Sequence, residues 1–137
     1  MSTKKPEIDV SVIIVTYNTG PLTQRCIASV YQHTKKKTIE VLVIDNASTD
    51  GSDKLLSELP YANYYYIYND NNVGFSKANN QAALQAVGEY LFFLNSDILL
   101  LNDVVCHLAD ILKNDTQQGI AGPMFQNPDG SLQVSCR

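Results

Sequence analysis

Residues 95–97 place an amide, a hydroxyl and a carboxylate together at the end of an apolar run. The stretch reads YLFFLNSDILL, so Asn95, Ser96 and Asp97 follow what the pattern predicts to be a buried strand. A single carboxylate can hold Mg²⁺ or Mn²⁺ when diphosphate oxygens and water complete the coordination shell. The pattern therefore predicts Asp97 as a metal ligand. Asn95 is predicted to hydrogen-bond a sugar or ribose hydroxyl, with Ser96 beside it in the ligand site.

Polar residues also follow three other apolar runs. These groups are Thr16-Tyr17-Asn18, Asp45-Asn46 and Asn69 to Asn72. The runs before them are β-branched or aromatic, whereas the segments between them carry apolar residues at helical spacing. Strands that alternate with helices predict an α/β fold with a mostly parallel sheet. The carboxyl ends of parallel strands share one edge, so the groups together predict a ligand crevice, although one group alone would indicate a turn or a helix cap.

The elements that position these groups can be assigned from the periodicity. The predicted strands are VSVIIVTY, IEVLVID, YYYIYND and YLFFLNSD, and a fifth is expected within GIAGPMF, residues 119–125. Helices are expected from Pro21 to the lysine run at 35–37, and over 53–59, 73–87 and 103–113. The aromatic third strand is expected near a sheet edge, its tyrosines packed on the sheet rather than stacked on a ligand.

Composition narrows the function classes. The chain has 137 residues, is 45% hydrophobic and carries a net charge of -4, which predicts one globular domain with no attraction for nucleic acid. It contains no apolar stretch near the roughly 20 residues of a membrane span, and no signal peptide at its start. Cys26, Cys106 and Cys136 are widely spaced, which favours reduced thiols in a cytoplasmic protein.

The first strand-to-helix turn excludes two familiar phosphate sites. TYNTGPL contains neither GxxxxGK[ST] nor GxGxxG, so backbone amides at this turn are not expected to cradle a phosphate. The charge of a bound diphosphate would then be met by the metal ion at Asp97.

In combination, these motifs resemble a known family. VSVIIVTYN, IEVLVIDNASTDGS, NDNNVGFSKANNQAAL and GEYLFFLNSD look like the nucleotide-sugar-binding part of the inverting family 2 glycosyltransferases, which have the Rossmann-like GT-A fold. The resemblance covers about residues 10–101, and the tail GPMFQNPDGSLQVSCR is similar to a bacterial branch that includes rhamnosyltransferase-like enzymes. It implies transfer of a sugar from a nucleotide-diphosphate sugar to a saccharide or lipid-linked saccharide, with inversion, in polysaccharide biosynthesis.

The resemblance also implies roles for residues at the first two strand ends. Thr16, Tyr17 and Asn18 would line the nucleotide pocket, with the Tyr17 ring against the base or, alternatively, closing the end of the sheet. Asp45 would accept a hydrogen bond from a pyrimidine N3–H, which favours uridine or thymidine over cytidine; its alternative role is a cap or turn. Asn46 is counted with the pocket, although Asn46 and Asp50 are expected to hold the NASTDGS turn rather than to contact the ligand.

Further roles, and one departure, concern the third and fourth strand ends. Gly74 would let the backbone pass close to the nucleotide, and Asn79, with its neighbour Asn80, would point toward the crevice. The family motif at the fourth strand is Asp-x-Asp, and Asn95 replaces its first carboxylate here. The Asp97 position is kept, and so is the expected Mg²⁺ or Mn²⁺.

The catalytic base is not assigned to any residue of this sequence. The family takes its base from an Asp or Glu after the metal motif, in the acceptor-binding half. The later carboxylates fall on predicted helix and turn positions, namely Asp103, Asp110, Asp115 and Asp129. We therefore expect the base beyond Arg137, and interpret residues 1–137 as a single, incomplete donor-binding domain that is inactive alone.

Two other classes of protein stay open at this point. A non-catalytic nucleotide-sugar-binding module would need only the residues assigned above. A nucleotidyltransferase would share the sheet and the metal carboxylate, but it normally has a glycine-rich, basic loop that TYNTGPL lacks. The expected location is the cytoplasm, at the inner face of the membrane for a longer form.

Overall fold

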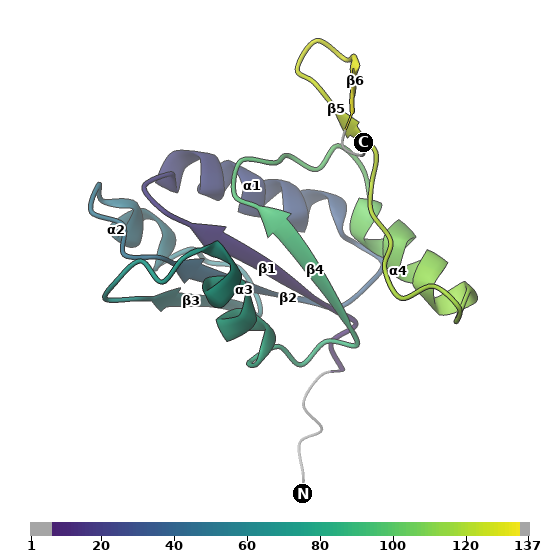
Figure 1. Ribbon diagram of the computed structural model, residues 1–137, viewed down its shortest axis with the longest axis horizontal. Coiled ribbons are helices and arrows are strands. Elements are labelled where there is room, and N and C mark those ends of the chain that lie inside the picture. Colours follow the sequence, from purple (N-terminus) through teal and green to yellow (C-terminus); the bar gives the residue numbers. More distant parts are fainter. Residues whose placement is uncertain (1–6, 135–137) are drawn as a thin grey trace, which may run out of the picture.

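A parallel sheet of four strands forms the centre of the molecule (Figure 1). The computed structural model describes residues 7–134. The strands are β1 (Val10–Thr16), β2 (Ile39–Asp45), β3 (Tyr64–Tyr68) and β4 (Tyr90–Asn95), in the spatial order β3-β2-β1-β4. The mostly parallel α/β sheet predicted from the sequence is confirmed.

Helices cover both faces of the sheet. One face carries α1 (Gly20–His33), α2 (Ser52–Leu56) and α4 (Val104–Asn114), and the other carries α3 (Phe75–Ala83). Figure 1 shows α3 on the near side of the sheet and α1 on the far side. This arrangement buries β1 and β2 on both faces, which explains why their sequences are nearly continuous runs of β-branched residues.

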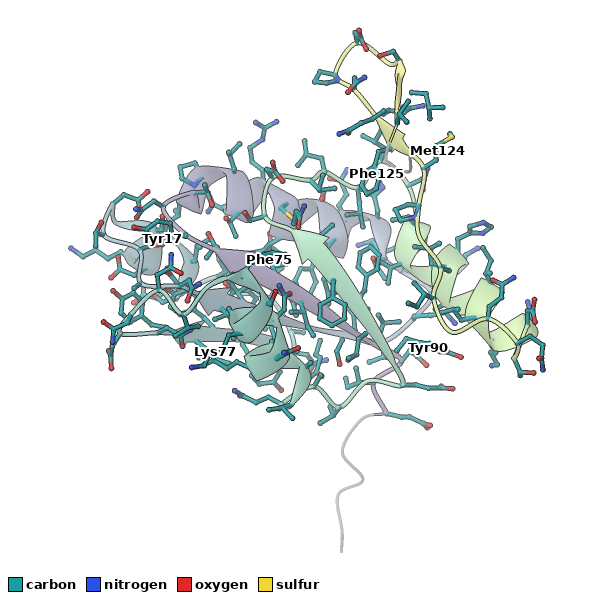
Figure 2. All side chains as sticks on the ribbon, viewed as in Figure 1. Tyr17, Phe75, Lys77, Tyr90, Met124 and Phe125 are labelled. Carbon is teal, nitrogen blue, oxygen red and sulfur yellow. The ribbon has the colours of Figure 1, made fainter. Side chains whose placement is uncertain are left out.

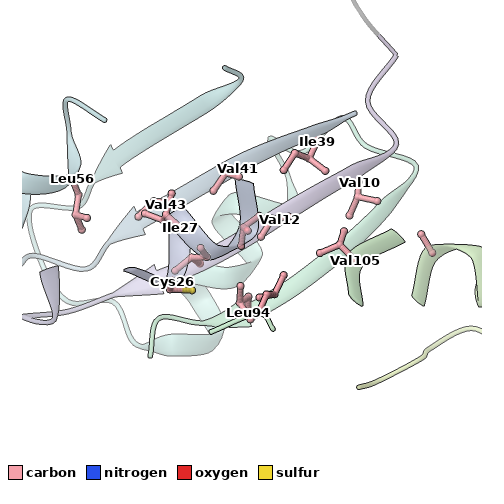
Figure 3. Close-up of a cluster of buried hydrophobic side chains, with 14 residues drawn as sticks. Val10, Val12, Cys26, Ile27, Ile39, Val41, Val43, Leu56, Leu94 and Val105 are labelled. Atoms are coloured by element: carbon pink, nitrogen blue, oxygen red, sulfur yellow. The ribbon is translucent and has the colours of Figure 1, made fainter. Parts of the chain in front are cut away.

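Two hydrophobic clusters, one on each face, hold the layers together. The larger joins side chains from all parts of the α1 face, including Val12, Val43, Ile27, Leu56 and Val105 (Figure 3). The smaller, on the α3 face, contains Ile13, Leu42, Ile44, Ala78 and Ala82. Fully burying one such valine or isoleucine side chain contributes about 1.5–3 kcal/mol, so these clusters fix the strand ends on which the site is built.

The prediction of a fifth strand within residues 119–125 is wrong. Residues 119–124 form no strand, and β5 (Phe125–Gln126) instead pairs antiparallel with β6 (Leu132–Gln133). Figure 1 shows this short hairpin standing away from the four-stranded sheet. Gly119, Gly122 and Pro123 weaken strand formation here, because glycine adds flexibility and proline has no N–H to donate to a neighbour.

The third helix ends earlier than its pattern predicts, at Ala83 rather than at residue 87. Side chains near the amino ends of β1 and β2 accept hydrogen bonds from the backbone that follows α3. The Val87 N–H donates to the Glu40 carboxylate at 2.7 Å, and the Gly88 N–H donates to the Ser11 hydroxyl at 2.8 Å. A Cβ at position 88 would lie 2.5 Å from the Ser11 nitrogen, so only glycine fits this close approach.

The tyrosines of β3 lie at a sheet edge, as expected. Tyr64, Tyr66 and Tyr68 share one face of the strand, and each phenol donates a hydrogen bond into the segment from the end of β2 to α2. They therefore brace the polar turn that follows β2. Among residues 7–134, no helix is both long enough and apolar enough to cross a membrane.

Candidate functional site

The pairing register brings the predicted polar groups to one edge of the sheet. Thr16 stands opposite Asp45, Asp45 stands opposite Tyr68, and Val15 stands opposite Asn95. The last residues of all four strands are therefore level with one another. The loops that follow them meet at the carboxyl edge, where ligands of open α/β sheets bind.

The loop after β1 is bonded to the turn after β2. The Asn18 N–H donates to the Ser48 hydroxyl at 2.9 Å, and the Asn18 side-chain oxygen accepts from the Thr49 N–H at 2.8 Å. The Gly20 N–H donates to the Ser52 hydroxyl at 2.9 Å, and a Cβ on Gly20 would lie 2.7 Å from that oxygen. Asn18, predicted to line the pocket, thus holds two loops together.

Asp50 stabilises the same turn from within. Its carboxylate accepts from the Ser52 N–H at 3.0 Å and from the Ser52 hydroxyl at 2.5 Å. These bonds lower the pKa of Asp50 below its ordinary value. This is the turn-holding role that the sequence predicts for Asp50.

Asp45 is completely buried, with 0% of its surface exposed. One carboxylate oxygen accepts from the Ser48 N–H at 2.8 Å, and the other accepts from the Tyr66 hydroxyl at 2.6 Å. Burial, and then the bond to Asp45, raises the pKa of Tyr66, so the phenol keeps its proton. This geometry supports the turn role of Asp45, and its contact with a nucleotide base stays a prediction.

Asn46 connects the end of β2 to the loop between β3 and α3. Its side-chain oxygen accepts from the Val73 N–H at 3.0 Å, and its amide nitrogen donates to the Asn72 side-chain oxygen at 2.8 Å and to the Gly74 carbonyl at 3.3 Å. Gly74 has φ 86°, which glycine adopts without strain. Asn46 therefore holds the loop between β3 and α3, whereas the sequence predicts that it holds the NASTDGS turn.

The end of β4 differs from the end of β2, because its carboxylate is exposed. Asn95 and Asp97 are both exposed, and no hydrogen bond or ion pair within residues 7–134 engages the Asp97 side chain. The Ser96 hydroxyl lies 3.4 Å from the Thr19 hydroxyl, which itself lies 3.1 Å from the Thr16 hydroxyl. Hydroxyl groups thereby connect the loop after β4 to the end of β1.

The charge of Asp97 also acts on a buried thiol, that of Cys26. Cys26 of α1 is buried and donates weakly to the Asn95 carbonyl, with a sulfur-to-oxygen distance of 3.6 Å. Burial raises the pKa of Cys26 to about 12, and the negative charge of Asp97 adds to this increase. Cys26 is therefore a neutral packing residue at physiological pH.

The remaining predicted residues divide between exposed and buried positions. Tyr17 is 49% exposed, which leaves its ring available to a base. Asn79 is buried, and its amide donates to the Phe75 carbonyl within α3 at 3.0 Å, whereas Asn80 is exposed. Sequence reasoning missed Phe75, which is 60% exposed at the start of α3. Figure 2 shows Tyr17 and Phe75 toward the end of the sheet where β1 and β4 finish.

A groove of about 1040 Å³ lies beside the end of β4. It is lined by the end of β4, by α4 and by the segment 122–130, and its lining includes both Asn95 and Asp97. Thr16, Tyr17 and Asp45 do not contribute to it. Asp97 therefore belongs both to the polar carboxyl edge of the sheet and to the lining of this groove.

The carboxylates after Asp97 all have local partners. Asp103 caps α4, accepting from the Cys106 N–H at 3.4 Å, and Asp115 accepts from the Gln117 N–H at 3.1 Å. Asp110 forms an ion pair with Lys37 at 2.8 Å, which lowers the pKa of Asp110. Asp129 accepts from the Ser131 N–H at 2.9 Å. No metal-binding cluster of three or more His, Cys, Asp or Glu side chains occurs in the described chain.

The sequence model described as glycosyl transferase family 2 matches residues 11–134, and the chain belongs to this family. The resemblance seen in the motifs is thereby confirmed.

Curated relatives and solved structures agree with this assignment. The N-acetylglucosaminyl-diphospho-decaprenol L-rhamnosyltransferase of Mycobacterium tuberculosis is 28% identical over 92% of this chain, which spans 44% of that enzyme. The structure of Staphylococcus aureus TarS 1-349 has a TM-score of 0.70 and 26% identity, covering 78% of this chain and 33% of the other.

A mannosyltransferase from Pyrobaculum calidifontis, PcManGT, was solved in complex with GDP-Man and Mn²⁺. It has a TM-score of 0.66 and 27% identity, covering 78% of this chain and 32% of its own. A TarS structure with UDP-GlcNAc, at a TM-score of 0.70 and 24% identity over 88% of this chain and 39% of the other, shows the fold alone. The chain thus spans less than half the length of the proteins it matches here.

Proposed function

We propose that this chain is the donor-binding part of an inverting glycosyltransferase that binds a nucleotide-diphosphate sugar at the carboxyl edge of its sheet. The observation that carries the proposal is the exposed, unengaged Asp97 next to Asn95 and Ser96, level with the loop that contains Tyr17. A carboxylate that forms no bond with the protein is free to act on a ligand.

The donor set at this edge fits a divalent metal ion. Mg²⁺ and Mn²⁺ need few protein ligands when a diphosphate supplies oxygens, and Asp97 is one exposed carboxylate with the exposed amide of Asn95 two residues before it. A bound ion would supply Lewis-acid stabilisation of the departing diphosphate. Mn²⁺ occurs in the PcManGT complex, which supports a metal ion in this relative.

The nucleotide would occupy the crevice between the first and third strand ends. In this proposal the Tyr17 ring stacks on the base, Thr16 and Asn18 line the pocket, and Asn95 bonds a sugar or ribose hydroxyl. Gly74 allows the backbone to approach the nucleotide. The uridine or thymidine preference rests on Asp45, whose carboxylate would accept from the base N3–H.

Sugar transfer also needs a general base that takes the proton of the acceptor hydroxyl. We infer that none of the carboxylates after Asp97 is that base, because Asp103, Asp110, Asp115 and Asp129 all have structural partners. Residues 1–137 would then bind donor without transferring sugar. The same observation keeps a non-catalytic nucleotide-sugar-binding module as the second candidate.

As acceptor we propose a saccharide or lipid-linked saccharide, used in the cytoplasm or at the inner face of the membrane. The rhamnosyltransferase relative, whose name includes a diphospho-decaprenol acceptor, supports this choice.

Calorimetry with nucleotide sugars tests the proposal. Titration with UDP-, dTDP- and GDP-sugars, with and without Mn²⁺, should show metal-dependent binding. Uridine and thymidine diphosphates should bind about 1–3 kcal/mol more tightly than cytidine diphosphate, the cost of leaving a buried polar group badly paired. Absence of binding to every nucleotide sugar would contradict the proposed function. Formation of a glycoside by the 137-residue chain would place a base within it and contradict the assignment of the later carboxylates.

A further inference from the structure

We infer that Ser29, on α1, is a positioning residue that fixes the loop carrying Asp97 and thereby sets the metal-dependent part of donor binding. The inference rests on the proposed function, in which Asp97 holds a divalent metal ion. Sequence reasoning gives Ser29 no role, because its position inside a helix predicts packing alone.

The direction of the Asp97 carboxylate depends on the backbone of its loop. Asp97 lies in a turn that the Ile98 N–H closes by donating to the Asn95 carbonyl at 3.2 Å. Its side chain forms no hydrogen bond or ion pair within residues 7–134, so no neighbour orients it directly. A metal ligand must be held close to its productive position. The groups that hold the backbone on either side of Asp97 therefore decide where its carboxylate can hold an ion.

Ser29 holds the backbone three residues after Asp97. Its hydroxyl accepts from the Leu100 N–H at 3.0 Å and donates to the Cys26 carbonyl of α1 at 2.7 Å. Because the single hydroxyl proton is used on Cys26, the oxygen faces Leu100 with its lone pairs. Ser29 and Leu100 are both buried, at 7% and 5% exposed. Little water can therefore replace this acceptor if the hydroxyl is removed.

The backbone before Asp97 is attached to the same helix more weakly. The Ser96 hydroxyl lies 3.4 Å from the Thr19 hydroxyl just before α1, and the Cys26 sulfur lies 3.6 Å from the Asn95 carbonyl oxygen. Both distances exceed those of ordinary hydrogen bonds. The loop after β4 runs along α1 (Figure 1), and the bond to Ser29 is the shortest of the hydrogen bonds that join the two.

The first test is the ratio of uridine diphosphate affinity with Mn²⁺ to that without it, measured by calorimetry for the unmodified 137-residue chain and Ser29→Ala. Alanine leaves the buried Leu100 N–H without an acceptor, so the loop should open more often and the ratio should fall about fivefold or more. If part of the Ser29→Ala protein is unfolded, both affinities fall by the same factor, so the ratio still reports on the loop.

Hydrogen exchange gives a second readout that needs no ligand. The Ile98 N–H, which closes the Asp97 turn, should exchange about tenfold faster in Ser29→Ala. The Val41 N–H of the buried strand β2 serves as the internal reference, because its exchange reports opening of the sheet as a whole. The expected change is in the ratio of the two exchange rates.

Two further variants separate positioning from general loss of stability. Ala28→Gly weakens α1 at the neighbouring position without touching the loop, so it should change neither ratio. In an Asp97→Ala background, Ser29→Ala should have no further effect on the Mn²⁺ ratio, because the group that Ser29 positions is already lost.

An unchanged Mn²⁺ ratio or unchanged relative exchange in Ser29→Ala, or an equal effect in Ala28→Gly, would overturn the role of Ser29 and leave the proposed function intact. Absence of nucleotide binding by the unmodified chain would contradict the proposed function, and this inference with it.

Discussion

Asp45 and Asp97 both follow a buried parallel strand at the same edge of the sheet, yet their surroundings are opposite. Asp45 has no exposed surface and accepts from Ser48 and Tyr66. Asp97 is exposed, and within residues 7–134 nothing bonds its carboxylate. Both carboxylate oxygens of Asp45 are thus engaged by the protein, whereas those of Asp97 are not. A strand-end aspartate therefore cannot be assigned a role from its position alone.

The largest expected difference between the two is in stability. Asp45→Ala should reduce the free energy of unfolding by about 3 kcal/mol, because it leaves the Tyr66 hydroxyl and the Ser48 N–H buried without an acceptor. Urea denaturation followed by circular dichroism measures this. Asp97→Ala is the matched control and should change the value by less than about 0.5 kcal/mol, as exposed substitutions do. A loss below about 1 kcal/mol in Asp45→Ala would show that the two carboxylates do not differ in this respect.

The reverse difference is expected in binding. Asp97→Ala should remove the Mn²⁺-dependent part of nucleotide affinity while the fold stays intact, because Asp97 is the one charged ligand of the motif. Titration with uridine diphosphate in the presence and absence of Mn²⁺ measures the metal-dependent part directly. Asp70→Ala, which removes another exposed carboxylate at the same edge, is the control. Retention of the full metal effect in Asp97→Ala would eliminate the assignment of Asp97.

The elements most easily predicted from the sequence are those whose cause is local. β1 and β2 are β-branched because both of their faces are buried, and Pro21 falls in the first turn of α1. The meeting of the strand ends follows from parallel topology. The approximate position of the loops at the carboxyl edge could therefore be derived without a structure.

The features that were not predicted depend on partners distant in sequence. Asp45 is engaged because Tyr66, on the edge strand, reaches across to it. The third helix ends early because Glu40 and Ser11, from two other strands, take the N–H groups of residues 87 and 88. No local pattern contains such contacts, so roles that depend on them are decided by the fold.

The turn after β2 and the interior of α1 should also respond differently to the introduction of a glycine. Ala47 has φ 70°, a conformation that costs a non-glycine residue about 1–2 kcal/mol. Ala47→Gly should stabilise the protein by about 0.5–1 kcal/mol after the greater freedom of glycine in the unfolded chain is counted. Thermal and urea unfolding measure the change. Ala28→Gly, inside α1, should instead destabilise by about 1 kcal/mol, and a destabilising Ala47→Gly would show that the turn is not strained.

The smallest expected effect reports on the charge of Asp97 itself. Cys26 has a pKa raised from 9.0 to about 12, first by burial and then by the charge of Asp97. The folded state thus holds the thiol proton more tightly than the unfolded state does, and the stability this provides is complete below about pH 9 and is lost as the pH rises toward 12. Asp97→Asn removes the smaller of these two effects. The pKa of Cys26 should therefore fall modestly, and the thiolate should form at a lower pH. The chemical shift of a ¹³Cβ-labelled Cys26, followed over the alkaline range in which the fold is kept, measures this.

Asp70→Asn should leave the titration unchanged, because Asp70 does not contribute to the pKa of Cys26. A Cys26 titration that is identical in Asp97→Asn and the unmodified chain would mean that Asp97 is too well screened by solvent to act on a neighbouring charge, and its suitability as the single charged ligand of a metal ion would be weakened with it.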